Sequence, residues 1–188
     1  MDRKEKFNQI IDELLPKIES APENETLRRE LGAAYMNAGR YQESIIEFQE
    51  AGNLDSQNSD TFHQLGIIFD RLGQYQDAIN YYMQTIKISP ENPDVLMDLG
   101  LVYDQVQDYE NAINIFKKII ELVPEDIEAH FHLGLAYDSL EDGENAITCT
   151  MQAEKLADAN KHVQWKASSN KSLRILFKRY QMDPKDFE

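Results

Sequence analysis

A Leu-Gly pair recurs every 34 residues along this chain of 188 residues. The glycines of the four pairs share one phase and are Gly32, Gly66, Gly100 and Gly134. A glycine inside a helix costs about 1 kcal/mol relative to alanine, so four of them at one phase need a structural reason. We expect them to allow paired helices to approach closely, with small residues opposite. A period of this length is typical of a protein built from stacked repeats.

Other positions share the period and predict two helices in each repeat. An aromatic residue follows each glycine by three places, a small residue by twelve, and an aromatic residue again by sixteen in the first three repeats. Apolar residues spaced three and four apart mark one face of each helix. Asn24 and Asn92 are predicted to cap the first helices of two repeats.

This 34-residue pattern of Leu-Gly, Tyr, Ala, Phe and Pro resembles the tetratricopeptide repeat, without pointing to a particular member of that family. The resemblance implies an all-α fold, a right-handed α-solenoid of four helical hairpins. The repeats are then predicted at 25–58, 59–92, 93–126 and 127–160. Repeat four departs from the pattern, because Gly143, Thr150 and Asp158 replace a tyrosine, an aromatic residue and a proline. Its second helix is therefore expected to pack less tightly or to face an unusual neighbour.

Both ends of the chain are predicted to form helices. Residues 1–24 carry a regular apolar stripe that resembles the second helix of a further, half-complete repeat, and Pro16 is expected to break or kink it. This helix is either a simple cap or a docking and dimerisation element. Residues 161–188 are predicted to form a capping helix, with a frayed tail from Met182. Its seven Lys and Arg residues against three acids would let it rest on the acidic body or compete with a ligand.

Composition excludes several classes of function. The net charge of −15 argues against nucleic acid, which needs clustered basic residues. No apolar run approaches the length of a membrane helix, so membrane insertion is not expected. With no secretory signal visible at the N-terminus and one cysteine, Cys149, the predicted location is cytoplasmic.

The resemblance places the first helix of each repeat on a concave wall that binds partners. The predicted partner-binding residues are Arg29, Met36, Asn37, Asp60, His63, Gln64, Ile67, Asp70, Arg71, Asp94, Met97, Asp98, Leu101, Asp104, Gln105, Glu128, Phe131, His132, Leu135 and Asp138. The set is acidic and also holds apolar side chains, so it predicts a protein or peptide partner with a basic, amphipathic segment. His63 and His132 are expected to make the groove mildly sensitive to pH.

Motifs for catalysis are missing from the sequence, which has no phosphate-binding loop, dinucleotide loop or nucleophile elbow. We therefore predict no catalytic residue, no metal and no cofactor. The leading hypothesis is a non-enzymatic interaction module, a scaffold or assembly factor. The alternatives are a dedicated chaperone for a secreted or aggregation-prone client, and a structural protein that self-assembles, with homo-oligomers formed through the terminal helices.

Overall fold

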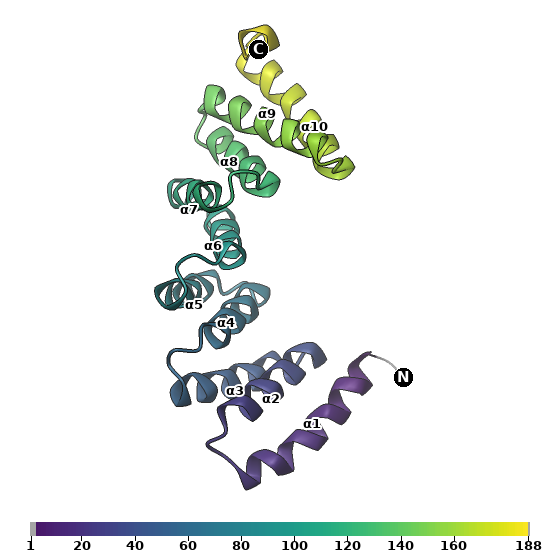
Figure 1. The fold of residues 1–188 in the computed structure, drawn as a ribbon, viewed down its shortest axis with the longest axis vertical. Helices are drawn as coiled ribbons and strands as arrows, with labels where there is room; N and C mark the ends of the chain where they lie inside the picture. Colours follow the sequence, from purple (N-terminus) through teal and green to yellow (C-terminus); the bar gives the residue numbers. More distant parts are fainter. Residues whose placement is uncertain (1–2, 188) are drawn as a thin grey trace. The chain divides into compact units, whose positions relative to one another are not determined.

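The structure is a computed structural model that describes residues 3–187, and it is helical throughout the described residues apart from turns (Figure 1). The elements are α1 (Arg3–Ser20), α2 (Glu25–Ala38), α3 (Tyr41–Leu54), α4 (Ser59–Arg71), α5 (Tyr75–Ile88), α6 (Pro93–Gln105), α7 (Tyr109–Leu122), α8 (Ile127–Ser139), α9 (Gly143–Ala159), α10 (Val163–Tyr180) and the short 3₁₀ helix η1 (Pro184–Phe187). They fall into two compact units, and the chain divides between them after Pro90. The first unit holds α1 to α5, and the second holds α6 to η1. Helices α2 and α3, α4 and α5, α6 and α7, and α8 and α9 pack as hairpins.

The first helix of every hairpin begins at a capping side chain. The caps lie 34 residues apart and are Asn24, Asn58, Asn92 and Asp126. The side chain of Asn24 accepts a hydrogen bond from the Leu27 amide at 3.1 Å. Such a cap contributes about 1 kcal/mol, because it satisfies an amide that the helix leaves unpaired. The predicted caps at Asn24 and Asn92 are thus confirmed, and the same period extends to the two others.

A left-handed residue closes the turn inside each hairpin. These residues also lie 34 apart, and their φ angles are 79° at Gly39, 72° at Gly73, 63° at Gln107 and 61° at Glu141. Glycine adopts this conformation without a Cβ clash, whereas a side chain makes it less favourable. The left-handed turn is therefore unstrained in the first unit, where a glycine forms it. In the second unit Gln107 and Glu141 adopt the same conformation at some cost in free energy.

Each mid-helix glycine makes room for the helix it pairs with. A Cβ on Gly66 would lie 2.5 Å from the Tyr82 ring, and one on Gly100 would lie 2.6 Å from the Phe116 ring. Gly32 faces the ring of Phe48 in the same way. The space at each of these three glycines is needed for packing, as predicted, but the group against the glycine is the aromatic ring sixteen residues later and not a small residue or the backbone. The small residue twelve places after the glycine is fully buried in every hairpin.

The fourth hairpin packs more closely, not less. Thr150 stands where the other hairpins have an aromatic ring, and its hydroxyl donates to the Ala146 carbonyl at 2.7 Å. A Cβ on Gly134 would lie 3.0 Å from that carbonyl oxygen and 3.2 Å from the Thr150 amide nitrogen. Without a ring between them, the backbones of α8 and α9 come together. The expected looser packing is wrong for this reason.

Gly143 faces an unusual neighbour, as the second of the two alternatives predicts. The ring of Tyr180, at the end of α10, lies where a side chain on Gly143 would have to go. The other hairpins begin their second helix with a tyrosine of their own. In hairpin four that ring is supplied from α10 instead.

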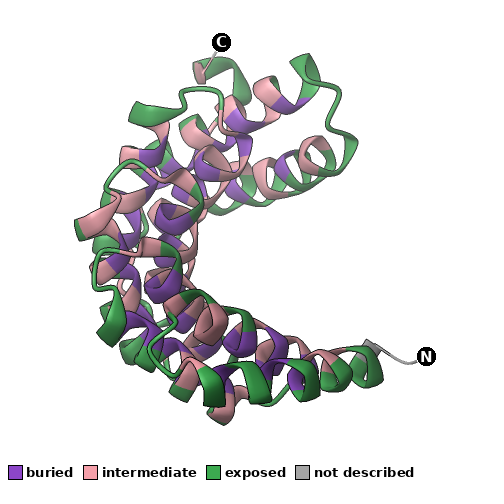
Figure 2. Cartoon of the chain, turned by 60° about the horizontal axis from the view of Figure 1, so that its bottom comes forward, coloured by how far each residue is buried: buried purple, intermediate pink, exposed green. Residues whose placement is uncertain are grey.

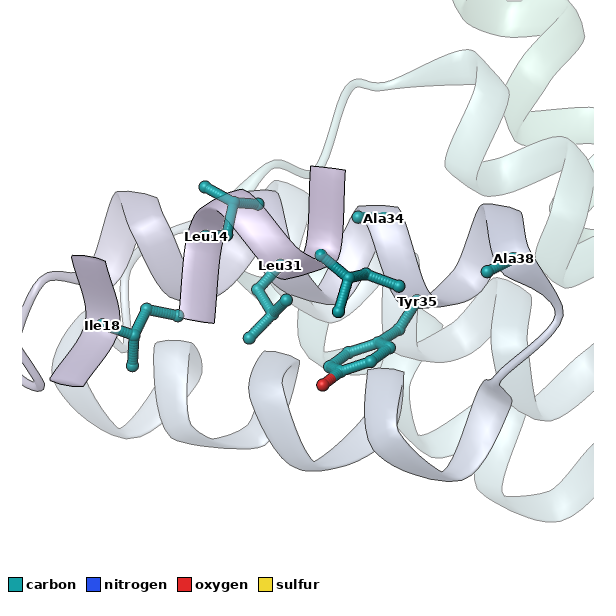
Figure 3. Close-up of a cluster of buried hydrophobic side chains, with 7 residues drawn as sticks. Leu14, Ile18, Leu31, Ala34, Tyr35 and Ala38 are labelled. Carbon is teal, nitrogen blue, oxygen red and sulfur yellow. The ribbon is translucent and has the colours of Figure 1, made fainter. Parts of the chain in front are cut away.

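Helix α1 packs its apolar stripe on α2. Leu14 and Ile18 of α1 belong with Leu31 of α2 to one buried cluster that these helices share (Figure 3). The expected break at Pro16 does not occur, because α1 is continuous from Arg3 to Ser20. Proline cannot donate a bond to the carbonyl of Asp12, one turn earlier. Asp12 and Pro16 are both exposed, so water can replace that bond.

The C-terminal tail contacts α10 and ends in the short helix η1. Leu176 of α10 is buried against hairpin four, and Met182 and Phe187 pack against the same cluster. The rings of Phe187 and Phe177 meet edge to face, with centroids 5.8 Å apart. The predicted fraying of the tail stays a prediction, and residue 188 lies outside the described residues. Within the described chain, no helix combines the length and the apolar character needed to span a bilayer.

We predict that Gly143→Ala lowers the free energy of unfolding of the second unit by about 1–3 kcal/mol, the usual range for overpacking. The loss should occur although alanine is the better helix former. In a Tyr180→Ala background, Gly143→Ala should be neutral or slightly stabilising, because the ring that it displaces is gone. Urea unfolding of the four proteins in this cycle measures both values. An equal loss in both backgrounds would contradict the proposed contact.

Candidate functional site

The predicted partner-binding residues all lie on the first helices of the hairpins, and none of them is buried. Buried residues lie between the helices of each hairpin, and the sides that face away from them are exposed or half-buried (Figure 2). The set therefore stays accessible in both units. The two units differ in what the set contains.

In the first unit, the predicted set is balanced in charge. Its charged members are Arg29 of α2 and Asp60, Asp70 and Arg71 of α4. Arg29 already pairs with Glu25, one turn earlier, with a nitrogen to oxygen distance of 2.6 Å. This part of the set is therefore not the source of the predicted acidity.

In the second unit, the predicted set is strongly acidic. We call this part the acidic wall, and it consists of Asp94, Met97, Asp98, Leu101, Asp104 and Gln105 of α6 with Glu128, Phe131, His132, Leu135 and Asp138 of α8. It holds five carboxylates and no lysine or arginine. Helices α6 and α8 are in direct contact, so the acids of the two helices share one surface.

Crowding among these acids is visible at Glu128. Burial raises the pKa of its carboxyl above the ordinary value, and the nearby charges of Asp126 and Asp98 raise it further. A raised pKa means that the ionised form is held at a cost. A cation brought close to Glu128 would lower this cost.

His132 lies among aromatic rings, not in open solvent. Its ring centroid is 5.7 Å from that of Phe116 and 6.2 Å from that of Trp165. Burial lowers the pKa of His132 below 6.5, against the opposing effect of Asp104 and Asp126. Its protonation would therefore disturb packing first, and the predicted pH sensitivity of the groove stays a prediction.

Helix α10 borders the acidic wall and contacts two of its residues, Phe131 and Asp138. The ring of Trp165 packs on Phe131 with centroids 5.3 Å apart. At the other end, Asp138 forms an ion pair with Arg179 and accepts a hydrogen bond of 2.8 Å from the Tyr180 hydroxyl. The basic helix thus rests on the acidic body, one of the predicted alternatives. Trp165 and Tyr180 were missing from the predicted site, although the aromatic stripe of 161–180 marks both.

Two features bear on chemistry at other positions. Burial raises the pKa of the Cys149 thiol to about 11, so the reactive thiolate is scarce at neutral pH. Among residues 3–187, no three His, Cys, Asp or Glu side chains are grouped closely enough to hold a metal ion.

Comparison with known proteins places the chain in a family. Three family models described as tetratricopeptide repeat match residues 23–91, 71–130 and 127–160. The chain belongs to the tetratricopeptide-repeat family. No curated protein matches its sequence.

Solved structures of tetratricopeptide-repeat proteins share the fold. A crystal structure of MamA has a TM-score of 0.79 and 24% identity, covering 86% of this chain and 98% of that chain. A MamA chain from Desulfovibrio magneticus has a TM-score of 0.70 and 20% identity, covering 85% and 97%. YrrB, described as a TPR protein with an unusual peptide-binding site, has a TM-score of 0.75 and 18% identity, covering 88% and 84%. These neighbours share the fold of this chain, and membership of the repeat family supports a protein-interaction module.

We predict that the second unit loses stability as the pH falls from 7.5 to 6. The folded state holds His132 neutral at a pH where the unfolded chain begins to bind a proton, so the free energy of unfolding drops as the pH passes 6.5 downward. Fluorescence of Trp165, the sole tryptophan, reports urea unfolding at this site.

The matched variants are His132→Phe and His162→Gln, the second of which changes an exposed histidine. His132→Phe should remove most of the difference between the two pH values, and His162→Gln should preserve it. An unchanged pH dependence in His132→Phe would refute the assignment.

Proposed function

We propose that the protein is a non-enzymatic interaction module whose acidic wall binds a basic, amphipathic segment of another protein. The observation that carries the proposal is the concentration of five carboxylates on α6 and α8, where no lysine or arginine of the wall offsets them. The repeat pattern alone spreads the predicted site over all four repeats. The charge distribution favours the second unit.

Electrostatics supports a cationic partner. The raised pKa of Glu128 reflects burial and the neighbouring charges of Asp126 and Asp98. A lysine or arginine from a partner would relieve this repulsion and speed association, while an acidic competitor would be repelled. Because Arg179 already neutralises Asp138, the strongest attraction is expected nearer Asp98 and Asp104.

Apolar side chains between the acids support an amphipathic partner. Met97, Leu101 and Leu135 are half-buried, so each has apolar surface left to cover. Methionine and leucine adapt to the side chains of a helix or an extended peptide laid along a groove. The protein YrrB offers an analogy, since it is described as carrying a peptide-binding site.

Two other predictions are untested and stay predictions. They are the cytoplasmic location and the repeat limits at 25–58, 59–92, 93–126 and 127–160.

A synthetic amphipathic helix of leucine and lysine tests the proposal. We expect it to bind the wild-type protein, and we expect Asp98→Lys/Asp104→Lys to weaken binding at least tenfold. The reason is that two attractions become repulsions, and about 1.4 kcal/mol corresponds to a factor of ten. Fluorescence anisotropy at several salt concentrations gives the affinities, and added salt should weaken wild-type binding.

The control is Glu121→Lys/Glu125→Lys, which makes the same change of charge at two exposed acids outside the wall. It should bind nearly as well as wild type, and circular dichroism must show both variants to be helical. If the two double variants lose affinity equally, the peptide responds to net charge alone, and the acidic wall is not the site.

A further inference from the structure

A second surface lies in the first unit, whereas the acidic wall belongs to the second. A pocket of about 410 Å³ opens between α1 and α2. Its lining residues come from both helices and are Phe7, Ile10, Glu13, Leu14, Lys17, Glu30, Ala33, Ala34 and Asn37. We call it the open seat.

The 34-residue period relates the α1 side of the open seat to the surface of α3 that packs on α2. Adding 34 to Ile10, Glu13 and Leu14 gives Ser44, Glu47 and Phe48 of α3. Those three residues hold α2 in the first hairpin. The Ser44 hydroxyl donates to the Gly32 carbonyl at 2.6 Å, Glu47 pairs with Arg28 at 2.8 Å, and the Phe48 ring packs on Gly32.

The same period relates the α2 side of the open seat to the surface of α4 that packs on α2. Adding 34 to Ala33 and Ala34 gives Ile67 and Ile68 of α4. Ile68 is buried in a cluster against which Ala33 and Met36 of α2 pack. Each wall of the open seat therefore corresponds to a wall that encloses the first helix of a hairpin. Among residues 3–187, no helix lies in the open seat.

Charge indicates what kind of helix fits. Glu13 occupies the place at which Glu47 meets Arg28, and both Glu13 and Glu30 are exposed. Neither forms an ion pair with a lysine or arginine side chain of residues 4–187. An incoming helix with a basic residue in its second turn would supply the missing cation.

We propose that the open seat binds an amphipathic helix of a partner protein, which packs as the first helix of a hairpin on α1 and places an arginine or lysine against Glu13. Its apolar face covers Phe7 and Ile10, which are half-buried, whereas Leu14 between them and α2 is already buried. At the position of Ser44 in the first hairpin, α1 carries the larger Ile10, so the partner helix needs a small residue opposite Ile10. At the position of Phe48, α1 carries the smaller Leu14.

The C-terminal helix of a second copy fits the open seat poorly. Trp165 and Leu176 of α10 pack on its own hairpin, and Phe177 is covered by Phe187. The apolar side of α10 is therefore used within its own chain. This favours a helix from another protein.

The test uses a fluorescent, helix-stabilised peptide with the sequence of residues 24–39, because α2 is a first helix with an arginine at the required place. We expect it to bind the full-length protein. Glu13→Arg should weaken binding at least tenfold, and a peptide with Arg28→Glu should bind Glu13→Arg better than it binds wild type. Such a charge-swap rescue identifies the pair of residues in contact.

Two controls establish that the peptide binds at the open seat and nowhere else on the chain. Glu19→Arg, at an exposed acid of α1 outside the pocket, should leave binding unchanged. The Asp98→Lys/Asp104→Lys variant should also bind the peptide normally, so this proposal and the acidic wall fail independently.

Three outcomes would overturn the proposal. The first is no binding of the peptide at concentrations up to 1 mM, set as about the weakest useful affinity. The second is equal loss in Glu13→Arg and Glu19→Arg. The third is a dimer in sedimentation velocity that Glu13→Arg dissociates, because the occupant would then be a second copy of this chain.

Discussion

The packing of a helix backbone against its partner depends on four glycines at one phase. A methyl group on Gly66 or Gly100 would collide with an aromatic ring, and one on Gly134 would collide with the Thr150 side chain. Glycine destabilises an isolated helix, but in the first three hairpins the missing Cβ lets a large ring be buried between two helices, and in the fourth it lets the two backbones come together. The free energy gained by burying such a ring exceeds the cost of placing a glycine inside the helix. The hairpins, and therefore the surfaces that they carry, follow from this contact.

Much of the fold could be predicted because the period constrains each repeat many times over. The helices, the caps at Asn24 and Asn92, and the tight glycine contacts all follow from local sequence. The contacts of α10 could not be predicted in this way. Tyr180 meets Gly143, and Arg179 meets Asp138, across distances in sequence that no period connects. Continuity through Pro16 was also missed, because it depends on water reaching an exposed turn and not on propensity.

The candidate site was predicted at the level of helices and not of chemistry. The resemblance to the family selects the first helices, and the structure leaves those positions accessible. Their charges, however, divide unequally between the units, and α10 pairs with Asp138 and packs on Phe131. A net charge calculated over the whole set shows neither the difference between the units nor the contacts that α10 makes. The acidic wall and the open seat consequently present different chemistry in different units.

The fit of Tyr180 on Gly143 also bears on how a repeat protein acquires its length. Repeats multiply by duplication, and a copy can be inserted wherever one hairpin stacks on another in the standard way. Hairpin four lacks the tyrosine that begins the other second helices, and it relies on α10 to supply the ring. A further hairpin inserted between hairpin four and α10 would separate Tyr180 from Gly143 and leave the second helix of hairpin four without a ring at that place.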